Sequence, residues 1–408
     1  MPKEGASLGA LLLILLTEHP MLRHLRAAAI LLSGAVALPS GAQQPAPAAA
    51  QPTVGTRWSY ASERTPFVAE VVATGIAIPF GMTFLPDGRM LVTDRRAGRL
   101  VAVDLKRGTT RDVRGVPAVW GKEDAGLLDV ILHPRYAENG WIYYSFSAGD
   151  SSGSTLAVER AKLRDDALVD RERLFTARGA LPNNTDHFGG RLVISRGYLF
   201  ITSGDRAAHR DSAQVLTSHF GKVLRLFDDG RIPPDNPFTK KAGALPEIWS
   251  YGHRNPQGLT LRPGTNDLWE IEHGPKGGDE LNLIRGGANY GWPVITYGEE
   301  YKGGPVGKGI TAMEGMEQPV HYYKPSIAPS GVEFYTGNAF PAWKGNVFIG
   351  ALALTHLNRL EMKGDSVVHE ERLIGDRNWR VRIVRTGPDG LIYLAVDGGM
   401  VIRLRPEH

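Results

Sequence analysis

The sequence contains no cysteine, and this absence excludes several kinds of chemistry at once. Disulfide bonds, thiolate metal ligands and a cysteine nucleophile are all ruled out. A strong excess of either charge is also missing, because 47 basic side chains face 43 acidic ones in 408 residues. A net charge of +4 is too weak for the dense basic stripe that nucleic-acid binding requires. We therefore expect no nucleic-acid partner.

Long apolar runs are rare, and those that occur lie near the start of the chain. Residues 21–26 are basic, residues 27–38 are apolar and residues 40–42 are small, which is the order of a secretory signal peptide and its cleavage site. We therefore interpret residues 1–42 as a signal peptide whose true start is Met21. A single uncleaved N-terminal anchor is the alternative.

The next segment, residues 43–66, begins rich in Ala, Pro and Gln and is predicted to be a flexible leader. The earlier apolar run, residues 8–16, is too short to span a bilayer. The mature chain is therefore expected to have no stable membrane span and to be periplasmic or secreted.

Phosphate-binding glycine loops are absent as well. Paired glycines occur at five places, but none stands in the Gly-x-Gly-x-x-Gly pattern that opens a helix. A nucleotide cofactor is therefore disfavoured. Long amphipathic helical stripes are also missing after the N-terminus, whereas 49 glycines and 27 prolines are present. This composition favours many short strands joined by tight turns.

One pattern recurs along the chain, namely two alternating apolar strands joined by Pro-Asp-Gly or a similar turn. Six such hairpins are predicted over residues 81–94, 128–146, 190–204, 258–270, 331–352 and 384–397. Their number and spacing predict an all-β fold, a six-bladed β-propeller over residues 67–408. The strand at residues 67–72 can complete the last blade and so remove a free sheet edge. A β-sandwich pair is the alternative.

Polar side chains that the blades do not need lie near the ends of the predicted strands. His187 precedes the first strand of the third hairpin, next to two glycines that permit close approach of a ligand, and Asp205 follows the second strand. A carboxylate beside an imidazole fixes its tautomer and raises its basicity, as a general base requires. A turn histidine and a turn-capping aspartate are the structural alternatives.

The densest polar segment, residues 246–259, contains His253, Arg254 and Asn255 in succession. Pro256 forces an extended backbone on Asn255. A guanidinium next to an amide suits a flat ligand that is rich in hydrogen-bond acceptors, such as a quinone or a carboxylate. This segment therefore predicts a ligand contact.

A second polar segment, residues 270–293, combines carboxylates with glycine-rich loops. Oxygen donors without thiols favour calcium over zinc. The single imidazole in this segment, His273, is interpreted as structural. Later in the chain, Arg380 and Arg382 share one strand face. They either grip a polycarboxylate or decorate an exposed surface.

In this order, the segments resemble the family of soluble glucose dehydrogenases and aldose sugar dehydrogenases that depend on pyrroloquinoline quinone (PQQ), also called glucose/sorbosone dehydrogenases. The resemblance extends from Phe67 to Pro406. Its most specific parts are Gly252-His-Arg-Asn-Pro-Gln-Gly258, His273-Gly-Pro275, Gly278-Asp-Glu-Leu-Asn282 and Asn289-Tyr-Gly-Trp-Pro293. It implies a six-bladed propeller that binds PQQ and calcium at its axial mouth, oxidises a sugar and passes the electrons to a quinone or a cytochrome.

The resemblance also implies roles for individual residues. His187 would be the base for the anomeric hydroxyl and Asp205 the carboxylate that supports it. Arg254 and Asn255 would contact PQQ, and Arg254 would stabilise negative charge there. The other implied residues are Tyr301, Ser326, Arg380 and Arg382 as quinone contacts, Gly274 and Pro275 as calcium-binding carbonyls, and Glu280 and Tyr290 as further calcium ligands.

Two positions depart from the family pattern. Asp124 stands where the family commonly has a glutamine, and Ala353 where it has a lysine that binds the cofactor. A carboxylate that faces the carboxylates of PQQ repels them, and the loss of one charge-assisted contact costs about 1.5–3 kcal/mol. We expect quinone binding to be weakened at these positions, with Arg254, Arg380 and Arg382 compensating.

Two other functions remain open on the sequence. A redox-inactive propeller that binds a carbohydrate or a protein would account for Asp124 and Ala353. A calcium-dependent, lactonase-like hydrolase would use the same oxygen ligands.

Overall fold

The structure is a computed structural model that describes residues 51–407. The predicted signal peptide, with Met21, and residues 43–50 of the predicted leader lie outside the described residues. The helical segments of the described part are the single turn α1 (Tyr136–Asn139) and two 3-10 turns, η1 (Arg210–Gln214) and η2 (Pro341–Trp343). None of the helices in residues 51–407 has the length and hydropathy of a membrane span.

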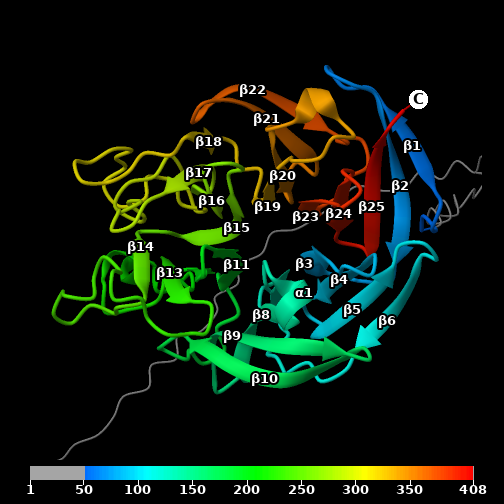
Figure 1. Ribbon diagram of the computed structural model, residues 1–408. Helices are drawn as coiled ribbons and strands as arrows, with labels where there is room; N and C mark the ends of the chain where they lie inside the picture. Colours follow the sequence, from blue (N-terminus) through cyan, green and yellow to red (C-terminus); the bar gives the residue numbers. More distant parts are fainter. Residues whose placement is uncertain (1–50, 408) are drawn as a thin grey trace, which may run out of the picture. The chain divides into compact units, whose positions relative to one another are not determined.

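The strands form six antiparallel sheets around a common axis, and we number these sheets as blades 1 to 6 in chain order (Figure 1). Blade 1 consists of β3 (Pro79–Phe84), β4 (Arg89–Asp94), β5 (Arg99–Asp104) and β6 (Thr109–Val113). Blade 2 consists of β7 (Leu127–Leu132), β8 (Trp141–Asp150), β9 (Gly153–Arg164) and β10 (Ala167–Thr176). Blade 3 consists of β11 (Gly189–Ser195), β12 (Tyr198–Ser203), β13 (Lys222–Phe227) and β14 (Ile248–Tyr251).

The second half of the ring is built in the same way. Blade 4 consists of β15 (Asn255–Leu261), β16 (Leu268–His273), β17 (Asp279–Ile284) and β18 (His321–Tyr323). Blade 5 consists of β19 (Pro329–Phe334), β20 (Val347–Ala351), β21 (Leu357–Lys363) and β22 (Ser366–Leu373). Blade 6 consists of β23 (Val381–Thr386), β24 (Ile392–Val396), β25 (Met400–Pro406), β2 (Phe67–Thr74) and β1 (Arg57–Tyr60). The predicted six-bladed β-propeller is confirmed.

The first two strands of every blade are one of the six hairpins that the sequence predicts. The turn chemistry explains why these strands pair where they do. Gly88 and Gly390, each after Pro-Asp, have φ of 86° and 77°, a conformation that glycine adopts without strain.

The two ends of the described chain close the ring. β2 pairs with β25, with Phe67 opposite Pro406, as the alternation in residues 67–72 predicted. β1 adds a fifth strand by pairing with β2. The prediction of a flexible leader is therefore wrong for residues 57–60. Arg57 forms an ion pair with Glu70 at 2.7 Å, and the ring of Trp58 packs edge-on against Trp379 at 5.0 Å.

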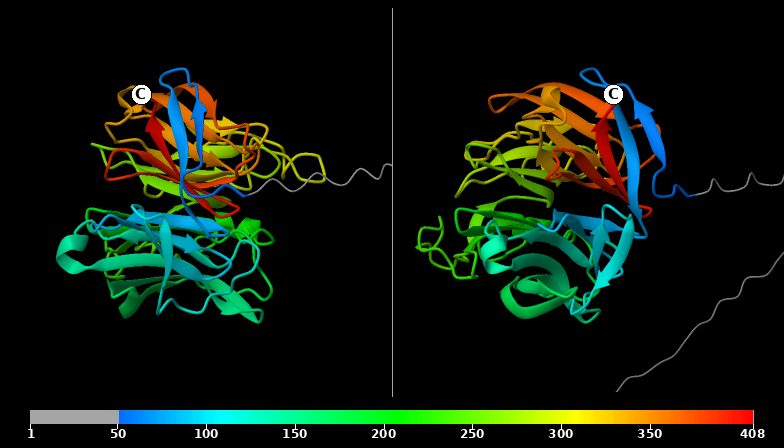
Figure 2. Two further views of the ribbon diagram at one scale, coloured as in Figure 1. Left: turned by 90° about the vertical axis from the view of Figure 1, so that its right-hand side faces the viewer. Right: turned by 45° about the vertical axis from the view of Figure 1, so that its right-hand side comes forward.

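The blades stand side by side around the ring (Figure 2), and the hydrophobic core is divided among the interfaces between them. Six clusters of buried side chains lie at these interfaces, and each is formed mainly by two neighbouring blades. Between blades 6 and 1, for example, Met82 and Val92 lie in one cluster with Ile383 and Tyr393. Each blade is therefore stabilised by burying both of its faces against its neighbours.

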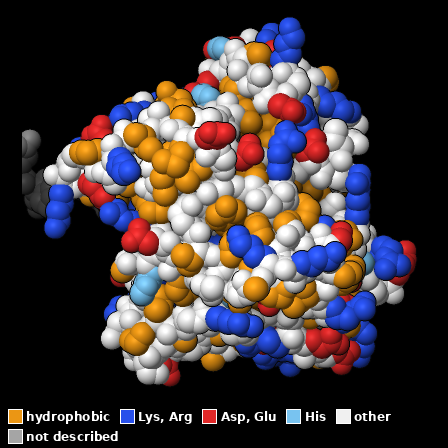
Figure 3. All heavy atoms as spheres, turned by 90° about the vertical axis from the view of Figure 1, so that its left-hand side faces the viewer, with side chains coloured by type: hydrophobic (Ala, Val, Ile, Leu, Met, Phe, Trp, Pro, Cys, Tyr) orange, Lys and Arg blue, Asp and Glu red, His pale blue; other side chains and the backbone are white. Residues whose placement is uncertain are grey.

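On the surface, basic and acidic side chains are interspersed over the side drawn in Figure 3, and hydrophobic side chains gather between them. The small net charge predicts such a mixture.

The pairing within the hairpins decides where the candidate site lies. The first strands of successive blades contact one another around the whole ring, with β23 contacting β3. Because first and second strands are antiparallel, the start of the first lies beside the end of the second. Gly189 pairs with Ser203, Asn255 with His273 and Val381 with Val396. We call the face on which these ends gather the axial mouth.

Candidate active site

A histidine and an aspartate from blade 3 form a close pair at the axial mouth. His187 Nδ1 lies 2.6 Å from Asp205 Oδ1, so the carboxylate fixes the ring proton on Nδ1. The Asp205 side chain is 1% exposed, whereas that of His187 is 15% exposed. Within residues 51–407 the other ring nitrogen, Nε2, has no hydrogen-bond partner. The pair therefore presents a proton acceptor to the mouth.

The backbone around this pair is constrained. His187 has a φ of 49°, in the left-handed region that non-glycine residues rarely adopt. Such strained conformations concentrate at functional sites, where the surrounding structure enforces them. A side chain at Gly204 would overlap the His187 carbonyl, so glycine is needed there to bring the two strand ends together.

Gly189 and Gly190, which follow Phe188, allow close packing of strands. A Cβ at Gly189 would lie 3.0 Å from the Thr202 backbone, and one at Gly190 would lie 2.5 Å from the Leu128 side chain. Both glycines thus allow β11 to approach its neighbouring strands closely.

The Asp205 carboxylate is held by further donors. The backbone N–H of Ala207 donates to Oδ1 at 2.8 Å, and the indole Nε1–H of Trp292 donates to Oδ2 at 2.7 Å. The backbone N–H of Asp205 in turn donates to the Arg254 carbonyl at 2.8 Å. Blades 3 and 4 are therefore joined directly behind His187.

Arg254 and Asn255 lie at the start of blade 4, on the same side as His187. Arg254 Nη1 donates to the His273 carbonyl at 3.1 Å, and its backbone N–H donates to Glu272 Oε2 at 2.5 Å. Asn255 Oδ1 accepts a hydrogen bond from Gln257 Nε2 at 3.1 Å.

His273, interpreted from sequence as structural, lies among the site residues. Its Nε2 donates to the Pro329 carbonyl at 2.7 Å. Burial lowers the pKa of His273 to about 3, helped by the charge of Arg254 and opposed by that of Asp124. His273 is therefore neutral and ties blade 4 to blade 5.

A cavity of about 580 Å³ opens between blades 4 and 5. Four positions singled out in the sequence line it, namely Pro275, Tyr301, Ser326 and Ala353. Two lysines, Lys276 and Lys324, line it as well, and Lys324 forms an ion pair with Glu299 at 2.9 Å. The cation expected at position 353 is therefore missing, but two ammonium groups border the same cavity.

The remaining charged candidates are already paired. Arg382 Nη2 lies 2.7 Å from Asp397 Oδ2, and Arg380 Nε lies 3.1 Å from the same oxygen. Any compensation by these arginines for the lost lysine therefore starts from ion pairs with Asp397. Asp397 neutralises part of their charge before any ligand binds.

Asp124 has a partner as well. Arg95 Nη1 lies 3.1 Å from Asp124 Oδ1, and the Arg95 side chain is 4% exposed. Burial acts to raise the pKa of Asp124, but the charges of Arg95 and Arg382 outweigh it and hold the pKa below its ordinary value. Asp124 is therefore an anion that Arg95 compensates.

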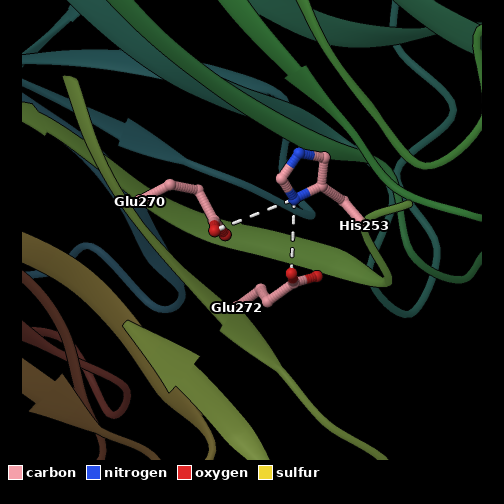
Figure 4. A group of neighbouring side chains, drawn as sticks. All are labelled: His253, Glu270 and Glu272. Atoms are coloured by element: carbon pink, nitrogen blue, oxygen red, sulfur yellow. Dashed lines mark hydrogen bonds and ion pairs between the residues drawn. The ribbon is translucent and has the colours of Figure 1, made fainter. Parts of the chain in front are cut away.

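A buried acidic cluster lies inside blade 4, on β16 and β17 (Figure 4). His253 Nδ1 lies 3.3 Å from Glu272 Oε1 and 3.9 Å from Glu270 Oε2. Glu280 pairs across the sheet with Glu272. Burial raises the pKa of both Glu270 and Glu280 well above the ordinary value, and the charge of Glu272 raises both further.

Some oxygens of this cluster lack partners. Among the described residues, Glu270 Oε1 and Asn282 Oδ1 are buried and accept no hydrogen bond. Carboxylate and amide oxygens without partners are the donors that calcium takes. Tyr290 stacks on His253 at 4.6 Å, but its hydroxyl already donates to the Leu283 carbonyl at 2.7 Å.

The other implied calcium ligands, Gly274 and Pro275, follow β16 at the mouth. Within residues 51–407 neither carbonyl accepts a hydrogen bond, which leaves both free for a ligand. Asp279 fixes this loop, because its Oδ1 accepts from the Gly274 N–H at 2.9 Å and its Oδ2 accepts from the Ser326 hydroxyl at 2.7 Å.

Sequence reasoning gave no role to several residues of the site, among them Arg95 and Asp397, and Asp279 and Trp292 within the segments that carry the resemblance. A signal for one of them existed. Asp94, Asp205 and Asp397 all stand at or just after the end of the second strand of a blade, so the pattern that pointed to Asp205 also pointed to Asp397.

The chain is similar to proteins that are already known. Residues 76–403 match the family model described as Glucose / Sorbosone dehydrogenase. The aldose sugar dehydrogenase YliI of Escherichia coli is 42% identical over 347 residues, which are 83% of this chain and 93% of that protein.

Solved structures of similar proteins show the same fold. The apo form of the soluble aldose sugar dehydrogenase from Escherichia coli superposes with a TM-score of 0.78 at 41% identity, covering 83% of this chain and 99% of that one. The PQQ-bound form of aldose sugar dehydrogenase from Streptomyces coelicolor gives 0.68 at 28% identity, covering 83% and 98%. This chain belongs to the glucose/sorbosone dehydrogenase family of oxidoreductases.

Proposed function

We propose that this protein oxidises the anomeric hydroxyl of an aldose to the lactone, with PQQ as its redox cofactor. The observation that carries the proposal is the His187–Asp205 pair, which leaves His187 Nε2 without a hydrogen-bond partner within residues 51–407 and is joined to the Arg254 carbonyl through the Asp205 N–H. The names of its relatives support the substrate class, and the PQQ-bound relative supports the cofactor.

The residues at the mouth fit an acidic, flat quinone. Arg254, Lys276 and Lys324 supply positive charge, and Tyr301 supplies an exposed ring beside the cavity. Arg380 and Arg382 would contact a carboxylate of the cofactor while each remains paired with Asp397. When bound, PQQ would supply the acceptor for the hydride, which carries both electrons of the oxidation.

The chain's own residues have distinct tasks in this reaction. His187 Nε2 takes the hydroxyl proton while the hydride leaves the anomeric carbon, so that the C–O single bond becomes the lactone carbonyl. Asp205 holds Nδ1–H and stabilises the imidazolium that forms. Arg254 keeps a positive charge next to the reacting atoms, where it stabilises developing negative charge. The electrons then pass to an external quinone or cytochrome.

Calcium is part of the proposal. The free carbonyls of Gly274 and Pro275 would hold it beside the cavity, where it compensates the carboxylates of the cofactor. Glu280, with the unpartnered oxygens of Glu270 and Asn282, offers a second place inside blade 4.

The test begins with apoprotein titrated with PQQ in calcium, followed by absorbance and calorimetry, and then by aldoses with a dye acceptor. We expect quinone uptake and dye reduction. His187→Gln should still bind PQQ but lose about 10²–10⁴-fold in kcat. His369→Gln, on the outer strand β22, is the matched control and should keep full activity. No quinone uptake and no dye reduction by the wild type would contradict the proposal.

The same preparation tests calcium and the two alternative functions. Metal analysis of wild type and Glu280→Gln should show fewer bound calcium ions in the variant. Lactone hydrolysis without PQQ, abolished by a chelator, would instead favour a hydrolase. Tight glycan or protein binding by a protein that never takes up PQQ would favour a redox-inactive propeller. The case for a redox-inactive propeller is weakened, because Arg95 compensates the charge of Asp124.

A further inference from the structure

Trp292 reaches the proposed base from another blade. It lies in the long connection between β17 and β18 of blade 4, whereas Asp205 and His187 belong to blade 3. Its indole Nε1–H donates to Asp205 Oδ2 at 2.7 Å, and this bond is buried. The Asp205 oxygen that accepts from Trp292 is the one that does not face His187.

This hydrogen bond is not a general property of the buried tryptophans. The indole nitrogens of Trp120, Trp269 and Trp343 are buried without a partner among the described residues. The Nε1–H of Trp292 therefore stands out because it meets a carboxylate, and a hydrogen bond to an ionised acceptor is stronger than one between neutral groups.

The position of Trp292 is fixed from several sides. Its backbone N–H donates to the Gly252 carbonyl at 2.9 Å, and its carbonyl accepts from Gln214 Nε2 at 2.7 Å. Its ring lies in a small buried cluster with Ala213 and Val306. These contacts hold the Trp292 indole beside Asp205.

The backbone beneath Trp292 is held in turn by a buried lysine. Lys222 Nζ donates to the carbonyls of Ser212, Ala213 and Phe220 at 2.9, 3.0 and 2.6 Å. These bonds fix the turn η1, which carries Gln214. A continuous set of hydrogen bonds therefore runs from Lys222 through η1 to Trp292 and Asp205.

We infer that Trp292 is a positioning residue, which orients Asp205 so that Asp205 can hold His187. The inference rests on the proposed function. Asp205 Oδ1 receives His187 and Ala207, but a carboxylate anchored on one oxygen alone can rotate about its Cβ–Cγ bond. The indole anchors the second oxygen and so prevents this rotation. Trp292 acts through Asp205 and transfers no proton itself.

The test is Trp292→Phe, which keeps an aromatic ring and removes the donor. We expect kcat to fall about tenfold or more, while the KM for sugar and the Kd for PQQ change less than about twofold. Trp343→Phe is the matched control, because it removes a buried indole nitrogen that has no partner, and it should keep its kcat. Trp292→Phe with full kcat would overturn the inference.

The Arg254 guanidinium lies 5.4 Å from the Trp292 ring centre, so Trp292 also has a possible effect on kcat through Arg254. A double-mutant cycle separates this effect from the effect through Asp205. On an Asp205→Asn background, Trp292→Phe should lower kcat by less than about twofold. A second full tenfold loss would show that the indole acts through Arg254 or the substrate, and would overturn the inference.

Nuclear magnetic resonance gives a readout that needs neither cofactor nor turnover. The short Nδ1–H bond of His187 should give a far-downfield proton signal in wild-type apoprotein, identified by its loss in His187→Gln. Trp292→Phe should broaden or abolish this signal, and Trp343→Phe should retain it. A signal unchanged in Trp292→Phe would overturn the inference even if the wild type oxidises sugars. An inactive wild type with the expected signals would overturn the proposed function alone.

Discussion

At the scale of single residues, the mouth holds pairs of opposite charge rather than free cations. Arg95 faces Asp124, and Asp397 faces both Arg380 and Arg382. An acidic cofactor must therefore compete with carboxylates of the protein for the same guanidinium groups. Its affinity should depend on which of these carboxylates is present.

Asp124→Asn should bind PQQ more tightly than the wild type. The substitution removes a like charge and releases Arg95 from its ion pair, so we expect Kd to fall about tenfold, or about 1.4 kcal/mol. Calorimetric titration measures the change. Glu123→Gln, which removes the neighbouring exposed pair with Arg96, is the control and should change Kd less than about twofold. Weaker binding by Asp124→Asn would mean that Asp124 contacts the cofactor through calcium or a proton.

Glu370 provides a pH-dependent test of stability away from the mouth. The His321 ring, whose Nε2 lies 3.7 Å from Glu370 Oε2, and hydrogen bonds from Asn358 and Arg372 lower the pKa of Glu370 to about 2. A lowered pKa stabilises the fold above pH 4.5 and loses this effect as the pH falls towards 2. Glu370→Gln should therefore be less stable at pH 7, by about 1 kcal/mol after allowance for screening by water.

Urea unfolding at several pH values measures this difference. The gap between Glu370→Gln and the wild type should shrink from pH 7 to pH 3, because below about pH 4.5 the unfolded wild-type chain takes up a proton at Glu370, which the folded protein does not bind until about pH 2. The exposed Glu138→Gln is the control and should follow the wild type throughout. If the difference in unfolding free energy between Glu370→Gln and the wild type does not change with pH, Glu370 stabilises this region by packing and not by its charge.

At the scale of elements, the sequence predicts what depends on neighbours along the chain. The six hairpins follow from alternation and turn residues, and the His187–Asp205 pair spans only one hairpin, 18 residues. The contact between Trp292 and Asp205 joins residues 87 apart, and no local pattern indicates it. β1 was missed for the same reason, since Arg57–Tyr60 become a strand only by pairing with β2.

The stability of the fold should depend more on β2, which closes the ring by pairing with β25, than on β1, which is added at the edge of β2. Phe67 in β2 is fully buried and packs against Tyr60 and Trp343 at 5.3 and 5.5 Å between ring centres. Phe67→Ala should lower the free energy of unfolding by about 3–5 kcal/mol. Trp58→Ala in the partly exposed β1 should cost less, and both are measured by urea unfolding. Equal losses would show that β1 closes the ring as much as β2 does.

At the scale of the whole molecule, one arginine joins five of the six blades at the axis. Arg191 of blade 3 donates to the carbonyls of Phe80, Gln257 and Arg382, at 2.7, 2.5 and 3.3 Å, in blades 1, 4 and 6. Its Nη1 lies 3.6 Å from Asp129 Oδ1 in blade 2, and both side chains are buried. Burial lowers the pKa of Arg191, and the charge of Asp129 opposes this effect.

Arg191→Met should destabilise the propeller as one unit. The substitution leaves three buried carbonyls without a donor and Asp129 without its cation, and losing one partner of a buried pair costs about 3–5 kcal/mol. Urea unfolding followed by fluorescence and by circular dichroism should give coincident transitions at a lower midpoint. Arg196→Met, in the exposed turn of the same hairpin, should change stability by less than about 0.5 kcal/mol. Two separate transitions in Arg191→Met would contradict this expectation. They would mean that the blades unfold together only because Arg191 joins them.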